Sequence, residues 1–443
     1  MLAVCFTGTK PDRETYMPHR NFYGWKLLAA LWAIVCINLA FPIYGARVLD
    51  AVMIEDLNLN RQTLGGIFSL YTIMSGLPGP LAALCVGRYG VRVTMFSGSL
   101  LVLIGSILMA TIVNSGLHAA LAFGVVVGTG VAMGGVVGAQ AGIAKWFVRK
   151  RALALAIFSS ASGIGGFIAS PLLNLVLGFT DKNWRMGWFL ITALAFAAAL
   201  ISLIYIRENP EDLGQLPDGD TSGTAEKRWA GTDQPRRVYL TSINWAYREV
   251  VSDRSFWLMM ICHMGMGCGY VLFLGHGVVH LMDIGHTRDA GAWAISLIAL
   301  TSLFGKGIIA ALGDRIEPRC IWAGFLALFG IGMILAVNPA TTALLVCVAA
   351  CIGIGFGGGV VCIATVLSNY YGTKVFASLI GLSLAFNTTM GAIVPYIAGR
   401  MYDSGYGYQG VFYALAIWCG VGAVVLFAMK IPVKENVPEQ ASL

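Results

Sequence analysis

The chain has 443 residues, of which 57% are hydrophobic and only 12% are charged. Soluble globular domains carry about 25% charged residues, so this chain has too little charge to cover the surface of a water-soluble protein of its size. The composition excludes an ordinary cytosolic enzyme, a disordered chain and a nucleic-acid-binding protein. The net charge of +7 therefore has to be interpreted by position along the chain.

Twelve apolar stretches follow one another along the chain, and each is long enough to cross a membrane. About 20 apolar residues span the roughly 30 Å of hydrocarbon in a bilayer. The sequence therefore predicts an all-α membrane protein with twelve transmembrane helices. Their approximate limits are 23–46, 63–86, 94–113, 118–144, 152–178, 186–206, 255–280, 290–312, 320–338, 341–368, 375–400 and 409–430.

One long polar segment, residues 207–254, divides these helices into two groups of six. The predicted organisation has five parts. They are a cytoplasmic tail at 1–22, a six-helix bundle at 23–206, a cytoplasmic linker at 207–254, a second six-helix bundle at 255–430 and a second cytoplasmic tail at 431–443.

Lysine and arginine residues are distributed unequally between the two sides of the predicted membrane domain. The side that holds both termini and the linker carries 22 of the 29, and the opposite loops carry six. Cytoplasmic loops are enriched in these residues. The distribution predicts a multi-pass protein of the inner (plasma) membrane with both termini in the cytoplasm. The remaining basic residue, Lys306, lies inside a predicted helix.

The two groups of six helices repeat one another in sequence. Gly-Gly-Val-Val at 134–137 recurs at 358–361, an offset of 224 residues. At the same offset, Trp146 and Phe147 align with the tyrosine pair at 370–371. Such repeats indicate two bundles related by an axis along the membrane normal, with a path between them that alternates its access.

Related basic motifs follow the second and the eighth predicted helix, at an offset of 227 residues. The first is the stretch 87–92 (Gly-Arg-Tyr-Gly-Val-Arg), and the second, at 313–319, contains an Asp-Arg pair. These motifs and the twelve helices resemble the major facilitator superfamily of transporters, whose loop here normally reads Gly-x-x-x-Asp-Arg-x-Gly-x-Arg. The resemblance implies a cytoplasmic gate in which the acid pairs with a neighbouring helix end. The implied gating residues are Arg88, Arg92, Asp314, Arg315 and Arg319.

The first copy of this motif departs from the family pattern. Gly87 occupies the position of the acid, whereas the second copy keeps Asp314. We therefore expect gate stabilisation to be weaker in the N-terminal half.

Finer motifs indicate a group within the superfamily. They are the stretches 145–154, 207–214, 255–257 and 369–372. Together they resemble the bacterial oxalate/formate antiporters and their relatives, the monocarboxylate transporters. The resemblance implies a carrier of small organic anions, with no enzymatic activity and no cofactor.

Lys306 is the clearest candidate for substrate binding. A charge inside the bilayer costs about 2.5–3.5 kcal/mol on insertion scales, and Lys306 lies eight residues before Asp314, about 12 Å from the helix end. One interpretation is a cationic hook for a carboxylate in a central cavity. The alternative is a buried lysine paired with backbone carbonyls for structure. In the resembled families a basic residue at this place, usually arginine, pairs with the substrate carboxylate.

The number of buried cations bears on the substrate. Oxalate exchangers of the resembled group carry a lysine on the eleventh helix, whereas that helix here has none at 385–390. A single buried cation favours a monoanion, and we expect a monocarboxylate.

Other polar side chains at similar depth are further candidates for substrate contact, although each is also explained as a hydrogen bond between helices. His263 has a depth like that of Lys306, and His276 could instead belong to an outer gate. The remaining candidates are Asn38, Tyr44, Ser302 and Asn387.

These observations predict a secondary active transporter that moves a small organic anion by alternating access, through proton symport or anion exchange. No acid lies deep in a predicted helix, so proton coupling would have to use histidine, Lys306 or the substrate. Alternatives are an efflux carrier for other small molecules and a transporter-like sensor. The expected partners are the anion, protons in the case of symport, and the lipid bilayer. We expect a monomer that binds no metal and no nucleic acid.

Overall fold

The structure is a computed structural model. The residues it describes are 22–57, 59, 61–219, 238–241, 243 and 245–432. Residues 1–21 and 433–443 of the predicted tails, and 220–237 of the predicted linker, lie outside this part. Its regular elements are all helical, and eleven are long and apolar enough to cross a membrane.

One of these eleven segments supplies two crossings. Gly66–Thr111 has 46 residues, about twice the length that a bilayer requires. The backbone leaves the helical conformation at Gly90, with φ of 86° and ψ of 173°, and glycine adopts such a positive φ without steric penalty. The second and third crossings therefore meet at Gly90, and the expected fold of twelve transmembrane helices is confirmed.

The N-terminal bundle contains the elements that precede the linker. They are α1 (Gly24–Val35), η1 (Cys36–Gly45), α2 (Ala46–Asp56), α3 (Arg61–Gly76), α4 (Gly79–Thr111), α5 (Gly116–Ala119), η2 (Ala120–Val127), α6 (Gly128–Met133), α7 (Val136–Trp146), α8 (Arg151–Phe179) and α9 (Trp184–Tyr205). The first crossing is continuous from α1 to α2, with a π-helical stretch around Pro42, whose ring removes one backbone donor.

The linker and the C-terminal bundle follow. The described linker contains η3 (Pro210–Leu213), η4 (Pro217–Gly219) and α11 (Tyr247–Ser252). The bundle contains α12 (Arg254–Asp283), α13 (Arg288–Leu312), α14 (Pro318–Ala336), α15 (Thr342–Tyr371), α16 (Thr373–Met401), η5 (Tyr402–Tyr406) and α17 (Gln409–Ala428).

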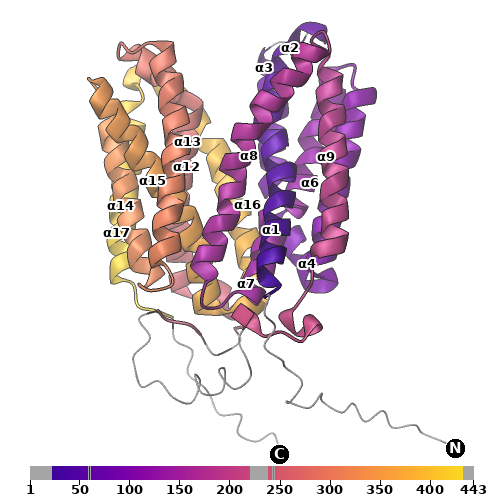
Figure 1. Cartoon of the computed structure of the whole chain (residues 1–443). Coiled ribbons are helices and arrows are strands. Elements are labelled where there is room, and N and C mark those ends of the chain that lie inside the picture. Colours follow the sequence, from indigo (N-terminus) through magenta and orange to yellow (C-terminus); the bar gives the residue numbers. More distant parts are fainter. Residues whose placement is uncertain are drawn as a thin grey trace, which may run out of the picture.

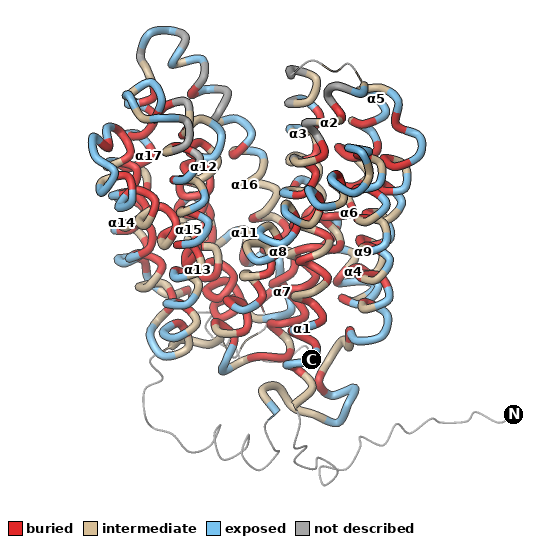
Figure 2. Tube along the Cα trace, turned by 45° about the horizontal axis from the view of Figure 1, so that its top comes forward, coloured by how far each residue is buried: buried red, intermediate tan, exposed pale blue. Residues whose placement is uncertain are grey.

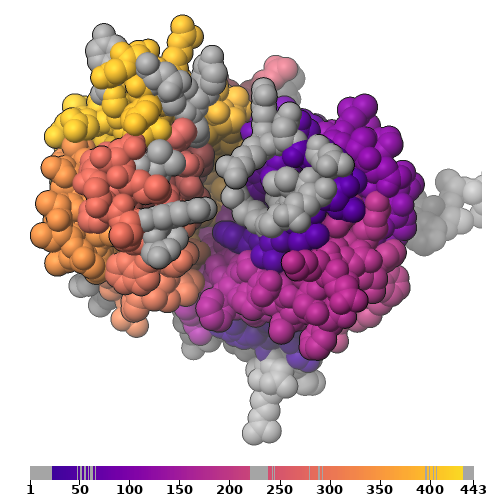
Figure 3. Space-filling model, turned by 90° about the horizontal axis from the view of Figure 1, so that it is seen from above, coloured from indigo at the N-terminus to yellow at the C-terminus, as the bar shows by residue number. Residues whose placement is uncertain are grey.

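The two bundles stand side by side and meet near one end of the molecule (Figure 1). We call this the linker end, because the described linker residues lie there, and the opposite end the far end. Between the bundles α8 contacts α13, and α16 contacts α3, α4 and α7. At the far end the halves separate, and a groove lies between them when the molecule is viewed from that side (Figure 3).

Each bundle has its own buried core. Buried residues concentrate between the helices of each bundle, whereas outward faces alternate exposed and intermediate positions (Figure 2). Many outward side chains are large and apolar, including Leu84, Phe196, Ile417 and Phe427. An apolar outer surface of this extent is suited to a lipid environment.

One contact between the bundles is made by backbone alone. A Cβ atom added to Gly79 of α4 would overlap the carbonyl of Gly381 in α16, and one added to Gly381 would overlap Gly79. Small residues permit such close approach between transmembrane helices. The two bundles therefore touch directly along α4 and α16.

Candidate functional site

Lys306 lies on α13 at the surface where the two bundles face one another. Its side chain is half-buried, and Nζ donates a hydrogen bond of 3.0 Å to the carbonyl oxygen of Ser159 on α8. An ammonium group has three N–H donors. The other two have no protein acceptor among the described residues. The lysine thus binds a backbone carbonyl, as expected for a structural role, and it also keeps two donors free for a ligand.

Asn38 and Ser302 are enclosed within their own bundles. The amide Nδ2 of Asn38 donates to Ser99 Oγ at 2.8 Å and to the carbonyl of Gly134 at 3.4 Å. Gly134 precedes the break between α6 and α7, so Asn38 supports an interrupted helix. The hydroxyl of Ser302 donates to the carbonyl of Ala299 at 2.7 Å. Neither side chain faces the groove in this conformation.

The two candidate histidines of α12 have different surroundings. His263 is buried within the C-terminal bundle, with its ring edge-on to Trp322 at 6.3 Å and no partner for Nδ1 among the described residues. His276 lies nearer the far end, where Nδ1 is 3.1 Å from the hydroxyl of Tyr408. His263 therefore packs against Trp322 of α14, and His276 belongs to an aromatic cluster at the far end.

Tyr44 and Asn387 are the candidates whose side chains remain exposed or half-buried. Tyr44 is 39% exposed, and its ring packs against Gly166 of α8. The amide of Asn387 is half-buried and packs directly against Gly267 of α12. No hydrogen bond to it is found among the described residues. Tyr44 thus keeps an exposed side chain, whereas the amide of Asn387 faces a helix of its own bundle.

Asp314 makes a contact between the two bundles at the linker end, where the family motif leads us to expect a gate. Its carboxylate accepts the N–H groups of Ala152, at 2.9 Å, and Leu153, at 3.2 Å, at the start of α8 in the opposite bundle. Carboxylates are stabilised at helix N-termini by these free donors and by the helix dipole. Burial nevertheless raises the pKa of Asp314 to about 6, against the opposing effects of the two N–H donors and of Arg151.

A second contact of the gate was missed in the sequence. Arg151 is buried, and its Nη1 donates to Asn369 Oδ1 across the bundles at 2.8 Å. Nε and Nη2 donate to the carbonyls of Phe147 and Ala144. Arg151 lies one residue before the predicted helix at 152–178, so the sequence predicts a loop residue. In the structure α8 begins at Arg151, and the side chain is buried between the bundles. Only the folded structure reveals this.

The other predicted gating residues do not join the bundles among the described contacts. Arg88 lies over the ring of Tyr89 at 5.4 Å, and Arg92 contributes its backbone N–H to Glu208. Arg315 is exposed. Nε and Nη1 of Arg319 are buried without a hydrogen-bond partner.

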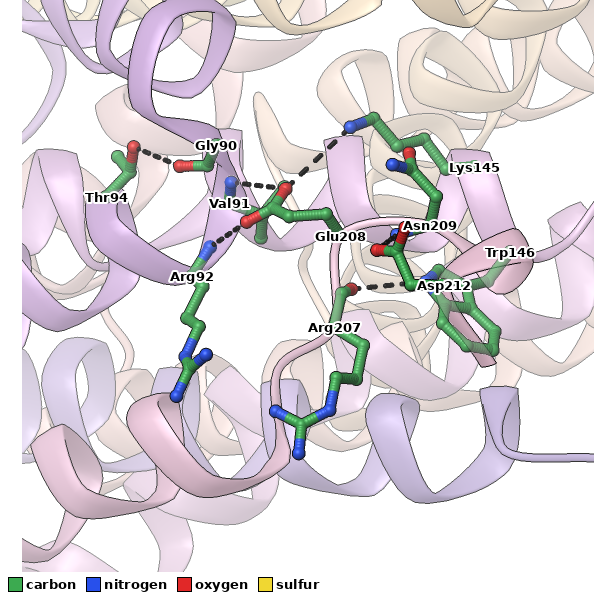
Figure 4. A network of polar contacts seen from close by, with 10 residues as sticks. All are labelled: Gly90, Val91, Arg92, Thr94, Lys145, Trp146, Arg207, Glu208, Asn209 and Asp212. Carbon is green, nitrogen blue, oxygen red and sulfur yellow. Dashed lines mark hydrogen bonds and ion pairs between the residues drawn. The ribbon is translucent and has the colours of Figure 1, made fainter. Parts of the chain in front are cut away.

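The first part of the linker is bound to the N-terminal bundle (Figure 4). The carboxylate of Glu208 accepts the N–H groups of Val91, at 2.9 Å, and Arg92, at 2.8 Å, just after the turn at Gly90. Lys145 lies 3.8 Å from the same carboxylate. Glu208 thus supplies an acid beside the motif that lacks one, but it joins groups of the same bundle and does not reach across.

The last part of the linker is bound in the same way to the C-terminal bundle. The N–H of Thr241 donates to the carbonyl of Asn369 at 2.8 Å, and the N–H of Tyr239 donates to Glu317 at 3.0 Å. Tyr371 Oη donates to Asp253 at 2.6 Å. The linker therefore holds the end of α15 that presents Asn369 to Arg151.

Comparison with known proteins agrees with this architecture. The family model described as Major Facilitator Superfamily matches residues 27–292 and 278–442. The chain belongs to the Major Facilitator Superfamily. It is a multi-pass membrane transporter and not an enzyme.

Relatives of this transporter include monocarboxylate transporters. Monocarboxylate transporter 3 of Rattus norvegicus is 26% identical over 417 residues, which cover 92% of this chain and 79% of the relative. Monocarboxylate transporter 12 of Homo sapiens is 25% identical over 436 residues, covering 92% and 80%.

Solved structures share the fold at low identity. The E. coli fucose:proton symporter superposes with a TM-score of 0.67 at 12% identity, covering 92% of this chain and 99% of that chain. The human organic anion transporter MFSD10 superposes with a TM-score of 0.65 at 15% identity, covering 93% and 100%. The transporter therefore shares its whole architecture with these carriers.

Proposed function

We propose that the chain is a secondary active transporter of small organic monoanions, and of monocarboxylates in particular. The observation that carries this proposal is the position of Lys306 between the bundles, with two N–H donors available to a ligand. Lysine provides a compact positive charge for a carboxylate. The names of the monocarboxylate transporter relatives support the same substrate class.

Transport would proceed by alternating access between the bundles. The excess of basic residues on the linker side assigns that end to the cytoplasm of a plasma membrane. The conformation in hand would then be open to the outside and closed to the cytoplasm by Asp314 and Arg151. Tyr44, with an exposed side chain, and Asn387, with a half-buried one, are further candidates for contact with such a substrate.

Uptake by purified protein in proteoliposomes tests the substrate class. Labelled propionate and pyruvate, each with one carboxylate, are expected to accumulate, and labelled oxalate, with two, is expected to be transported at least tenfold more slowly. Lys306→Ala is expected to abolish propionate uptake, and Lys306→Arg to retain part of it because the cation remains. Lys430→Ala, which removes an exposed lysine after α17, is the matched control.

Two results would contradict the proposal. One is propionate uptake by Lys306→Ala with the rate and affinity of the parent protein. The other is saturable propionate binding without any transport, which would favour a sensor. The same vesicles separate the coupling modes: propionate inside accelerates uptake in an exchanger, whereas an inwardly directed proton gradient accelerates it in a symporter.

A further inference from the structure

The bond from Lys306 to Ser159 joins the two bundles away from the gate. Lys306 belongs to α13 and Ser159 to α8, and Nζ lies 3.0 Å from the carbonyl oxygen. The cross-bundle hydrogen bonds from Arg151 and Asp314 lie at the linker end. Lys306 and Ser159 are each eight residues from those gate positions, about 12 Å further along their helices.

The internal repeat shows that this bridge has no counterpart on the other side of the interface. The offset of 227 residues that relates Arg88 to Arg315 places Gly79 at the position of Lys306. Gly79 meets Gly381 by backbone contact alone. One of the two pseudo-equivalent contacts is therefore fixed by close packing, and the other is a single hydrogen bond from a charged side chain.

These two kinds of contact respond differently to a ligand. A backbone contact between glycines offers nothing that a small anion could replace. The ammonium of Lys306, in contrast, is held by a neutral carbonyl, and a carboxylate would add a Coulombic attraction that this carbonyl lacks. A carboxylate that binds through the two remaining N–H groups therefore attracts the ammonium toward itself and weakens its bond to Ser159.

Opening of the linker end would break the same bond. The bridge lies in the part of the interface where α8 contacts α13, and this part must separate when the gate opens. While Lys306 is bound to Ser159, it stabilises the conformation in which the far end is open.

We propose that Lys306 is a latch between the bundles that the substrate releases. In the empty carrier the lysine ties α13 to α8, and in the loaded carrier it binds the substrate carboxylate and the tie to α8 is lost. This inference rests on the proposed function, since it requires the substrate carboxylate to reach Lys306. Its consequence is that the loaded carrier reorients more readily than the empty one, which favours anion exchange over net transport.

The test measures the conformation of the empty carrier and does not depend on transport. Spin labels attached through unnatural amino acids at Lys182 and Asp283, both exposed near the far end, report the distance between the bundles. In the parent protein without anion we expect the far-end-open distance to dominate. In Lys306→Met we expect the ratio of open to closed far ends to fall about tenfold, the effect of losing one hydrogen bond to a charged group.

Addition of propionate to the parent protein is expected to shift the distances in the same direction as Lys306→Met does. Lys306→Arg is expected to retain the open distance, because a guanidinium can also donate across the interface. Lys430→Met, which removes an exposed lysine away from the bridge, is expected to match the parent protein. Thermal unfolding of each variant verifies that it is folded.

The two hypotheses fail in different ways. Equal distance distributions for the parent protein and Lys306→Met without anion would overturn the latch, whether or not Lys306 binds substrate. A shifted distribution in Lys306→Met together with unchanged propionate affinity would overturn the proposed substrate site and leave the bridge standing as a structural tie. A parent protein whose distances do not respond to saturating propionate would also overturn release by substrate.

Discussion

At the scale of single residues, the interface between the bundles depends on three polar side chains with different partners. Lys306 and Arg151 are cations that donate to neutral oxygens, of Ser159 and of Asn369, and Asp314 is an anion held by backbone N–H groups. None of these contacts pairs opposite charges at hydrogen-bond distance. Each can therefore be made and broken without separating an ion pair in a low-dielectric environment.

The hydrogen bond between Arg151 and Asn369 is expected to stabilise the closed linker end. In Arg151→Met, loss of a hydrogen bond to a charged group should reduce the ratio of closed to open linker ends about tenfold. Asn369→Ala should act in the same direction, and the double variant should add little further, because both changes remove one bond. Spin-label distances at the far end provide the measurement. Lys150→Met, at an exposed neighbour, is the control, and additive effects of the two substitutions would contradict the assignment.

Asp314 is expected to make the gate sensitive to pH. Its pKa is about 6 in the closed gate, raised by burial from an ordinary value of 3.8, and we expect exposure in the open gate to return it toward that value. The closed gate therefore binds a proton more tightly, so its advantage is fully present below about pH 4 and is lost as the pH rises through about 6. Far-end distances measured between pH 4.5 and 7.5 should report this shift, and Asp314→Asn should remove it. An unchanged pH profile in Asp314→Asn would assign the effect to another group.

At the scale of helices, contacts between the bundles combine close backbone packing with a few polar bonds. Gly79 and Gly381 bring α4 and α16 together without side chains. Where α8 meets α13, a lysine side chain lies between the helices. In alternating access these helices would move against one another. Close packing would then restrain α4 against α16, whereas a bond that a ligand can break would restrain α8 against α13.

A methyl group at the close backbone contact is expected to separate α4 from α16. Gly79→Ala would place Cβ against the carbonyl of Gly381, and overpacking of this kind costs about 1–3 kcal/mol. We expect a lower thermal unfolding temperature and at least tenfold slower propionate uptake. Gly87→Ala, two turns along the same helix, has open space at Cβ and should behave like the parent protein. Equal losses in the two variants would contradict the assignment to this contact, because the higher helix propensity of alanine cannot cause them.

At the scale of the whole molecule, the two halves share a fold but close the gate with different chemistry. The C-terminal half supplies Asp314 to the start of α8, whereas Gly87 occupies the corresponding position in the N-terminal half. The weaker stabilisation expected there remains a prediction, because Glu208 binds within its own bundle. The linker is bound at both of its described ends, one to each bundle, so each part is expected to move with its own half.

An acid at position 87 is expected to add, in the N-terminal half, a gate contact like that of Asp314. Gly79 of α4 lies against Gly381 of α16. Eight residues nearer the linker end, the corresponding positions are Gly87 on α4 and Thr373, the first residue of α16. A carboxylate near a helix N-terminus contributes about 0.3–1 kcal/mol, so Gly87→Asp should raise the ratio of open to closed far ends two- to fivefold. Spin-label distances at Lys182 and Asp283 measure this ratio. Gly87→Asn should have a smaller effect, and a shift toward a closed far end would contradict the proposed symmetry of the gate.

The sequence by itself determined the number of crossings, the two-fold repeat and the family, because hydrocarbon thickness fixes helix length and internal repeats are visible without coordinates. It also singled out Lys306 and Asp314, since a charge in an apolar helix and a motif acid are both local signals. Only the tertiary structure decided which polar residues face the groove. It placed Asn38, Ser302 and His263 inside their bundles and left Tyr44 exposed.

Tertiary structure also revealed Arg151 as a buried gate residue and gave Lys306 its partner. The physical reason is that depth in the membrane can be counted along a single helix, whereas the direction of a side chain depends on the rotation of that helix against its neighbours. Partners such as Ser159 and Asn369 lie 147 and 218 residues away in the chain, and a single sequence contains no signal that joins them.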